Sequence, residues 1–179
     1  MLSLEAFLNQ TQDKVVYWGT KGEKIKNSYQ LDSFSKLELI SNGQLLFGED
    51  VRSLIKKPSV SELRQDVEYH YQTIREHAQK TGRNFYSFGW FLDISRCLYT
   101  LKTGKTIAKT KAGDWALQEK LCPVEKELKF ALEVRNNPLK YKHDEKVFDY
   151  AETLGEAVQK YADVLEQRLN LTNQESDKE

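Results

Sequence analysis

The chain has 179 residues, of which 39% are hydrophobic and 11% aromatic, enough for a packed core and too much for a disordered chain. Its 27 basic and 27 acidic side chains leave no net charge, so it lacks the positive field of a general nucleic-acid binder. No segment approaches the roughly 18 consecutive apolar residues of a membrane span, and the first residues are not basic as in a signal peptide.

Residues 1–57 predict a small α/β segment built from short pieces. The run KVVYWG, residues 14–19, is typical of a strand because it is rich in β-branched and aromatic side chains. The run DSFSKLELISNG, residues 32–43, predicts a helix that Asp32 caps. QLLFG, residues 44–48, predicts one more short strand. These pieces offer little apolar surface, so we do not expect the segment to fold alone.

Residues 58–172 predict a bundle of five amphipathic helices joined by short turns, which makes the fold mainly α. The first helix begins with Ser59 and Glu62 at the spacing of a capping box, in which each side chain satisfies a backbone N–H of the other residue. The run TGRN, residues 81–84, ends this helix. The second helix ends at Gly104, a residue that favours the left-handed conformation found after helices.

The third predicted helix begins near Lys109 or Thr110. The fourth runs from about Val124 and is broken by Asn136-Asn137-Pro138. The fifth carries a single apolar stripe over residues 147–169, and residues 173–179 form a flexible polar tail. The residues at helical spacing on the five predicted helices, in chain order, are Leu63, Val67, Tyr71, Ile74 and Ala78; Phe91, Ile94, Leu98 and Leu101; Ala112, Trp115 and Ala116; Leu128, Leu132 and Arg135; and Val147, Ala151, Leu154, Val158, Ala162, Leu165 and Leu169.

Residue types that bind metals or act as nucleophiles are not grouped in this sequence. His70 and His77 lie roughly 10 Å apart along a helix, too far for both to bind one ion directly, and His143 stands alone. Cys97 and Cys122 lie in apolar patterns with no histidine nearby, which is typical of buried reduced thiols in a cytoplasmic protein. We therefore predict no metal site, no catalytic nucleophile and a cytoplasmic location.

Paired carboxylates that hold Mg²⁺ are the usual requirement of nucleotidyl transfer, often as Asp-x-Asp on one strand. The sequence contains no Asp-x-Asp and no glycine-rich phosphate loop. Asp66 and Glu68 come nearest, but residues two apart in a helix point about 200° apart. We therefore expect no catalytic residues of this kind in the chain.

The stretch TGKTIAKTKAGDWAL, residues 103–117, forms a basic corner between the second and third predicted helices. Lysines 102, 105, 109 and 111 cluster here, and Arg96 lies two turns before Thr103. A helix N-terminus offers free N–H groups and partial positive charge, so a lysine placed there makes an anion site. The alternative is a solvated loop that leads into an ordinary helix, with Trp115 in the core.

The run SRCLYTLKTGKTIAKTKAGDWAL, residues 95–117, resembles the C-terminal helical domain of bacterial aminoglycoside adenylyltransferases of the streptomycin/spectinomycin type. The shared pattern is an Arg, an aromatic residue, Thr-Gly-x-Ile-x-x-Lys and Ala-x-x-Trp-Ala, and this chain has one extra residue before Ile107. The matching residues here are Arg96, Tyr99, Thr103, Gly104, Lys109, Ala112, Trp115 and Ala116. The resemblance extends over roughly residues 15–170, so residues 1–57 would be a remnant of the family's nucleotidyltransferase domain.

The resemblance implies an enzyme that transfers AMP from ATP to a drug hydroxyl, with Mg²⁺ bound on the N-terminal domain, and hence a role in antibiotic resistance. It also implies that Lys109, Tyr161 and Arg96 form the nucleotide-binding site, the first two at the ATP phosphates. ATP and an aminoglycoside would therefore be the small-molecule partners.

The sequence departs from the family at its head motif, Gly-Ser followed by Asp-x-Asp, which is absent here. We therefore expect a truncated protein that keeps the ATP-facing and substrate-facing helical domain, lacks the Mg²⁺ ligands and is inactive alone. One alternative is a non-catalytic module that binds a nucleotide or another small ligand. Another is an interaction protein that forms a homodimer, or binds a partner chain, through the exposed edge of residues 1–57.

Overall fold

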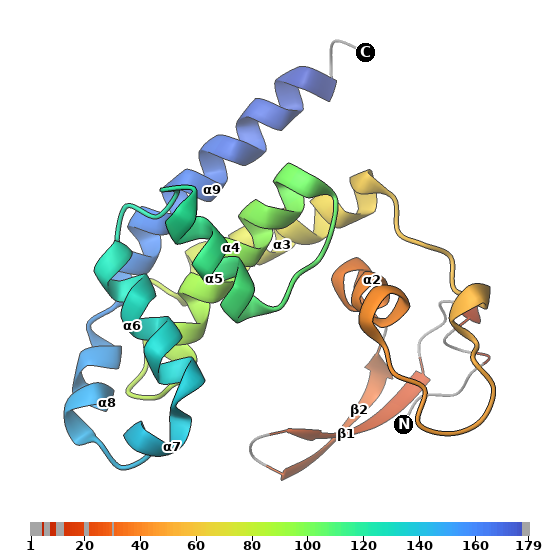
Figure 1. Cartoon of the computed structure of the whole chain (residues 1–179), viewed down its shortest axis with the longest axis horizontal. Helices are drawn as coiled ribbons and strands as arrows, with labels where there is room; N and C mark the ends of the chain where they lie inside the picture. The colour runs from red at the N-terminus through yellow and green to blue at the C-terminus, as the bar shows by residue number, and fades with distance from the viewer. Residues whose placement is uncertain (1–4, 6–7, 10–12, 20–21, 30, 177–179) are drawn as a thin grey trace. The chain divides into compact units, whose positions relative to one another are not determined.

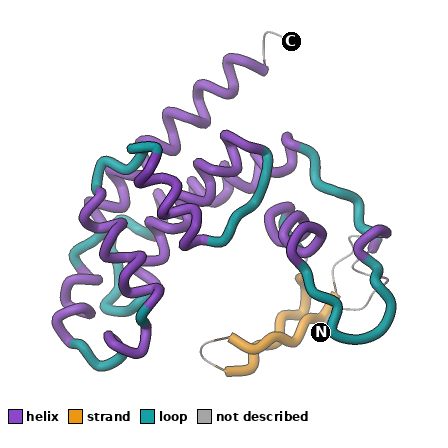
Figure 2. The backbone as a smooth tube through the Cα atoms, in the orientation of Figure 1, coloured by secondary structure: helices purple, strands orange, loops and turns teal. Residues whose placement is uncertain are grey.

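The computed structural model describes residues 5, 8–9, 13–19, 22–29 and 31–176, and helices make up most of it (Figure 2). The chain divides into two compact units, residues 1–62 and residues 63–179. Within the described part of the chain, no helix has the length and apolar character needed to cross a bilayer. The mainly α fold expected from the sequence is confirmed.

The first unit contains an antiparallel hairpin of strands β1 (Asp13–Gly19) and β2 (Gly22–Tyr29), with Val16 opposite Ile25. Strand β1 agrees with the predicted strand at residues 14–19. Strand β2 was not predicted, because its run GEKIKNSY is mostly polar and carries a weak strand signal.

Helix α2 (Ser33–Asn42) begins as the sequence predicts, because Asp32 accepts a hydrogen bond from the backbone N–H of Ser35 at 2.6 Å. The 3-10 helix η1 (Arg52–Leu54) follows after a loop. The strand predicted at residues 44–48 is wrong, because that run lies in the loop and pairs with no strand among the described residues.

The helical unit begins with α3 (Val60–His77), whose first residues belong to the first unit. The predicted capping box is confirmed: Ser59 N–H donates to Glu62 Oε2 at 2.7 Å, and Glu62 N–H donates to Ser59 Oγ at 3.2 Å. Helices α4 (Tyr86–Thr103), α5 (Lys109–Gln118) and α6 (Glu125–Asn136) follow near their predicted positions. The short helix α7 (Pro138–Tyr141) then leads to the C-terminal helices.

The predicted fifth helix is two helices, α8 (Glu145–Glu152) and α9 (Gly155–Ser176) (Figure 1). The break brings the backbone of Gly155 against the end of α3, where an added Cβ would lie 2.1 Å from the carbonyl oxygen of Gln79. All seven predicted stripe residues, from Val147 to Leu169, are nevertheless buried. Helix α9 also continues through residues 173–176 of the predicted tail, and residues 177–179 lie outside the described residues.

Helix α4 is the central element of the helical unit, because α5, α6 and α9 all pack against it. Its predicted core residues Phe91, Ile94 and Leu98 are buried, whereas Leu101 is half-buried. Trp115 on α5 was also predicted to be core but is only half-buried. Its ring meets Tyr99 edge-on at 5.2 Å between centroids.

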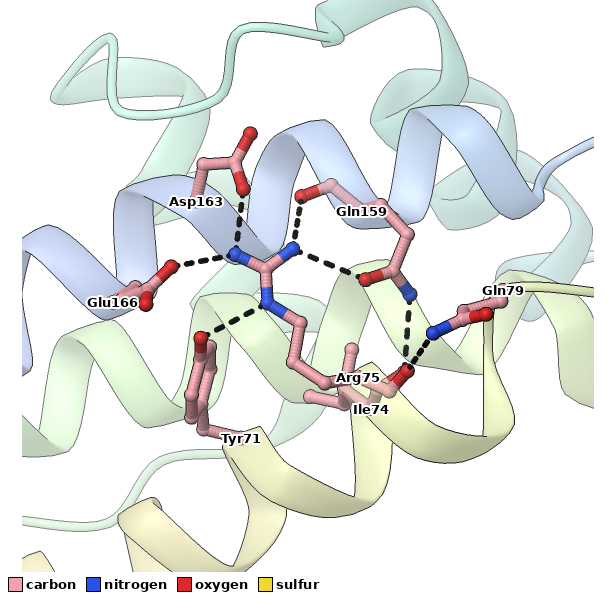
Figure 3. Close-up of polar contacts among 7 residues, drawn as sticks. All are labelled: Tyr71, Ile74, Arg75, Gln79, Gln159, Asp163 and Glu166. Carbon is pink, nitrogen blue, oxygen red and sulfur yellow. Dashed lines mark hydrogen bonds and ion pairs between the residues drawn. The ribbon is translucent and has the colours of Figure 1, made fainter.

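Helices α3 and α9 are joined by a polar cluster around Arg75 (Figure 3). One guanidinium nitrogen lies 2.5 Å from Asp163 Oδ1 and 2.8 Å from Glu166 Oε2. Another donates to the backbone oxygen and the side-chain oxygen of Gln159, and Nε donates to the hydroxyl of Tyr71. Burial disfavours the charged form of Arg75, but these hydrogen bonds outweigh it and raise the pKa of the guanidinium.

Candidate functional site

The corner between α4 and α5 is ordered by its own hydrogen bonds. Gly104 has φ of 63°, in the left-handed region, and its N–H donates to the carbonyl of Thr100 at 2.8 Å. The Thr100 hydroxyl donates to the carbonyl of Lys105 at 3.0 Å, while Thr103 Oγ1 donates to the carbonyl of Tyr99 at 2.8 Å. The corner is therefore a loop ordered by these hydrogen bonds, in which Lys105 and Ala108 are exposed to solvent.

Lys109 is the first residue of α5, and its side chain crosses to α4. Its Nζ lies 2.6 Å from Asp93 Oδ1, and the two side chains are 35% and 21% exposed. An ion pair that is partly withdrawn from water is screened less than a surface pair. The pair therefore holds the Lys109 ammonium against Asp93 on α4.

Both members of this pair line a cavity of about 410 Å³, within the roughly 300–1,000 Å³ typical of small-molecule sites. One wall comes from the first turns of α4 and the other from α6 and the start of α7. The charged lining residues are Asp93, Lys109 and Arg135, so the cavity has one carboxylate and two cations. The remaining lining residues are Phe85, Tyr86, Phe88, Gly89, Trp90, Leu92, Ala131, Val134 and Pro138.

A family model described as the C-terminal domain of aminoglycoside adenylyltransferase matches residues 53–147, more than half of the chain. The chain belongs to this family. The match takes in α3 to α7, and with them every residue that lines the cavity, whereas α9 lies beyond it. Searches among curated proteins and among solved structures found no match.

The predicted lysine cluster of this adenylyltransferase C-terminal domain is not gathered at one point. Lys102 is turned toward Glu119 at 2.5 Å, with its Nζ 5.6 Å from the ring centroid of Trp115. Lys105 and Lys111 are exposed and do not line the cavity. Lys109 is the one of these four lysines that lines the cavity.

Arg96 and Tyr161, the other two predicted nucleotide-binding residues, do not line the cavity either. Arg96 is half-buried on α4, one turn beyond Asp93. Tyr161 is 0% exposed in the core, and its hydroxyl lies 3.0 Å from Ser95 Oγ. Burial raises the pKa of Tyr161, with the hydrogen bond to Ser95 acting in the opposite direction. A hydroxyl enclosed in this way has no route to a phosphate, so the structure disagrees with the phosphate contact expected of Tyr161.

The other residues of the cavity were not predicted as site residues, and four of them are Gly89, Trp90, Asp93 and Arg135. Three of them lie on one face of α4, at a spacing that the helical pattern of residues 86–103 contains. These residues line one cavity because α6 packs against α4, and the spacing of apolar residues within a helix does not predict how two helices pack.

Magnesium is implied by the family, but the described residues do not fit it. Among them, no group of three or more His, Cys, Asp or Glu side chains could hold a metal ion. The one carboxylate of the cavity, Asp93, already pairs with Lys109. The cavity therefore combines two cations, Lys109 and Arg135, with a carboxylate that is already paired, and no metal-dependent step follows from it.

Proposed function

We propose that the helical unit binds ATP through its phosphates at Lys109, and that the chain does not transfer AMP on its own. The observation that carries the proposal is the position of Lys109. It is the first residue of α5, it lines a cavity of about 410 Å³, and Arg135 brings a second cation to the same cavity. Phosphate groups combine charge with many acceptor oxygens, which suits this set of donors.

The ion pair with Asp93 affects how Lys109 would bind a phosphate. Before a nucleotide binds, Asp93 holds the Lys109 ammonium in a single orientation at 2.6 Å. An incoming phosphate then competes with this carboxylate for the ammonium and also receives the N–H groups at the start of α5. Binding is therefore weaker than it would be at an unpaired lysine, and it depends on salt concentration.

Transfer of AMP to an aminoglycoside, the acceptor named by the family, requires more than this site supplies. Nucleotidyl transfer uses metal-bound oxygens to neutralise the charge that develops on the phosphate. The sequence has no Asp-x-Asp pair, and Asp93 is committed to Lys109. The proposed activity of the chain alone is therefore binding without turnover.

The test combines binding and turnover in one preparation of the purified full chain. ATP affinity is measured by titration calorimetry with and without Mg²⁺, and pyrophosphate release is measured with and without streptomycin. We expect saturable ATP binding and no streptomycin-dependent release. An absence of ATP binding would overturn the nucleotide site, and aminoglycoside-dependent release would show that the chain transfers AMP.

A second candidate function is association through the first unit. Three consecutive apolar residues in its loop are exposed, Leu46 at 92% and Phe47 at 98%, with Leu45 beside them. Apolar clusters of this kind are often covered by another chain. Sedimentation over a hundredfold range of concentration tests this candidate: a Phe47→Ser variant should shift the equilibrium toward the monomer, and a monomer at every concentration for the parent chain would exclude self-association.

A further inference from the structure

A groove between α6 and α8 is separate from the cavity that Lys109 lines. It has a volume of about 530 Å³, and its lining residues are Lys126, Lys129, Phe130 and Glu133 of α6 with Lys146, Val147 and Tyr150 of α8. The cavity takes other residues of α6, namely Ala131, Val134 and Arg135. Neighbouring residues of a helix point about 100° apart, so the groove and the cavity lie on different faces of α6.

The apolar part of the groove is aromatic and partly open to solvent. Val147 is buried, whereas Phe130 and Tyr150 are half-buried, with their ring centroids 5.6 Å apart. The ring of Phe130 also lies 5.6 Å from that of Phe88 and 5.9 Å from that of Tyr141, so neighbouring rings hold it in place. An ordered apolar surface that water still reaches can receive the apolar side chain of another molecule.

The lysines of the groove carry more charge than nearby acids neutralise. Glu133 is the one carboxylate of the lining, and a lysine of α7 already binds it at 2.9 Å. Lys129 lies 2.9 Å from Glu125. Lys126 and Lys146 are exposed, and no acid in the described part of the chain pairs with either. The groove is therefore complementary to a segment that combines an apolar side chain with a free carboxylate.

The chain carries such a segment in the loop after α2, the run LLFGED of residues 45–50. Leu46 and Phe47 are almost fully exposed. Asp50 binds Arg52, but Glu49 is exposed, and the described residues give it no ion-pair partner. The loop thus presents a phenylalanine and, two residues later, an unpaired carboxylate.

We propose that the groove binds the loop of residues 45–50 from a second copy of the chain, with Phe47 against the aromatic lining and Glu49 beside Lys126 and Lys146. This inference rests on the second candidate function, association through the first unit, and adds to it the surface that receives the loop. The apolar contact supplies most of the affinity, since burying a phenylalanine contributes more than an exposed ion pair. The two lysines favour an acidic segment and make the association depend on salt concentration.

Sedimentation of the full chain over a hundredfold range of concentration measures the association. Phe47→Ser should weaken it roughly ten- to a hundredfold, because it removes the apolar side chain. Reversal of both groove lysines, Lys126→Glu with Lys146→Glu, should weaken it severalfold, and so should Glu49→Lys alone. The three substitutions together should restore it, because the charges are exchanged and remain complementary.

A matched control separates this effect from a change of net charge. Lys105→Glu with Lys111→Glu alters the net charge equally, at two exposed lysines that do not line the groove, and should associate like the parent chain. Melting temperatures close to that of the parent chain establish that the variants are folded.

A fluorescent peptide of residues 43–51 tests the groove independently of the oligomeric state. Fluorescence anisotropy should show that it binds the Phe47→Ser chain, whose own loop no longer competes, and that reversal of both groove lysines weakens this binding severalfold. Association that the reversal leaves unchanged would overturn the groove and leave association through the first unit standing. A parent chain that is monomeric at every concentration would overturn both. Peptide binding by such a monomer would mean that the groove receives an acidic segment of another protein instead of a second copy.

Discussion

Lys109 and Asp93 form an ion pair of 2.6 Å that connects the start of α5 to α4 at the wall of the cavity. Because the carboxylate occupies the ammonium that a phosphate would use, it competes with an anionic ligand. Asp93→Asn should therefore bind tripolyphosphate severalfold more tightly than the parent chain, as measured by titration calorimetry at low salt. Asp114→Asn, at an exposed acid of α5, is the control for a change of net charge. Weaker binding by Asp93→Asn alone would mean that Asp93 positions Lys109 rather than competing for it.

Tyr161→Phe separates a core role from a nucleotide role for this tyrosine. The substitution removes the hydroxyl that lies 3.0 Å from Ser95 Oγ, and Ser95 keeps its bond to the carbonyl of Phe91 at 2.8 Å. We expect a loss of about 0.5–1.5 kcal/mol in the free energy of unfolding, with unchanged affinity for ATP. Urea denaturation and calorimetry on the same preparation measure the two quantities. Unchanged stability with lost ATP binding would restore Tyr161 to the site.

Arg75→Met tests the connection between α3 and α9. Arg75 is 26% exposed and binds two carboxylates and the backbone of Gln159, so methionine replaces the aliphatic part of the side chain and loses every hydrogen bond. We expect a loss of about 1–2 kcal/mol in urea denaturation, because the two carboxylates remain partly solvated. Arg83→Met is the matched control, since Arg83 also binds two acids, Glu145 and Asp149, but at a more exposed position. Equal losses for the two variants would mean that burial of the Arg75 cluster adds no stability.

The sequence predicted the helical unit well because its evidence is local. Helical spacing placed the buried residues of α3, α4 and α6, and the Ser59–Glu62 capping box and Gly104 marked helix ends through contacts within a few residues. The break before α9 could not be predicted in this way. It depends on the contact of Gly155 with Gln79, which lies 76 positions earlier in the numbering of the chain.

In the candidate site, too, the local features could be predicted from the sequence and the contacts between helices could not. The position of Lys109 at a helix start follows from the local pattern of residues 103–117. Its partner Asp93 and the opposite cation Arg135 come from other helices, so their proximity is a property of packing. Tyr161 was placed by resemblance and spacing, and only the packing of α9 against α4 reveals that its hydroxyl is enclosed. The strand expected at residues 44–48 failed for a related reason, because a strand exists only with a paired neighbour.

The two buried thiols predict how stability depends on pH. Desolvation raises the pKa of Cys97 and of Cys122 from an ordinary value of 9.0 to about 12. Above pH 9 the folded chain therefore retains protons that the unfolded chain releases, so stability falls as pH rises toward 12. Urea denaturation at pH 8 and pH 10 should show a loss of roughly 2–3 kcal/mol for the two thiols together. Cys97→Ala should reduce that difference, and identical free energies at the two pH values would contradict the burial of the thiols.

The charge of Lys109 is the point on which the proposed function depends most directly. Lys109→Ala removes the ammonium, and Lys111→Ala removes an exposed lysine of the same helix that does not line the cavity. A charge-assisted hydrogen bond contributes about 1.5–3 kcal/mol, so ATP should bind Lys109→Ala roughly ten- to a hundredfold more weakly, with Lys111→Ala close to the parent chain. Titration calorimetry at one fixed salt concentration measures all three affinities. Equal ATP affinity for the parent chain and Lys109→Ala would contradict the account.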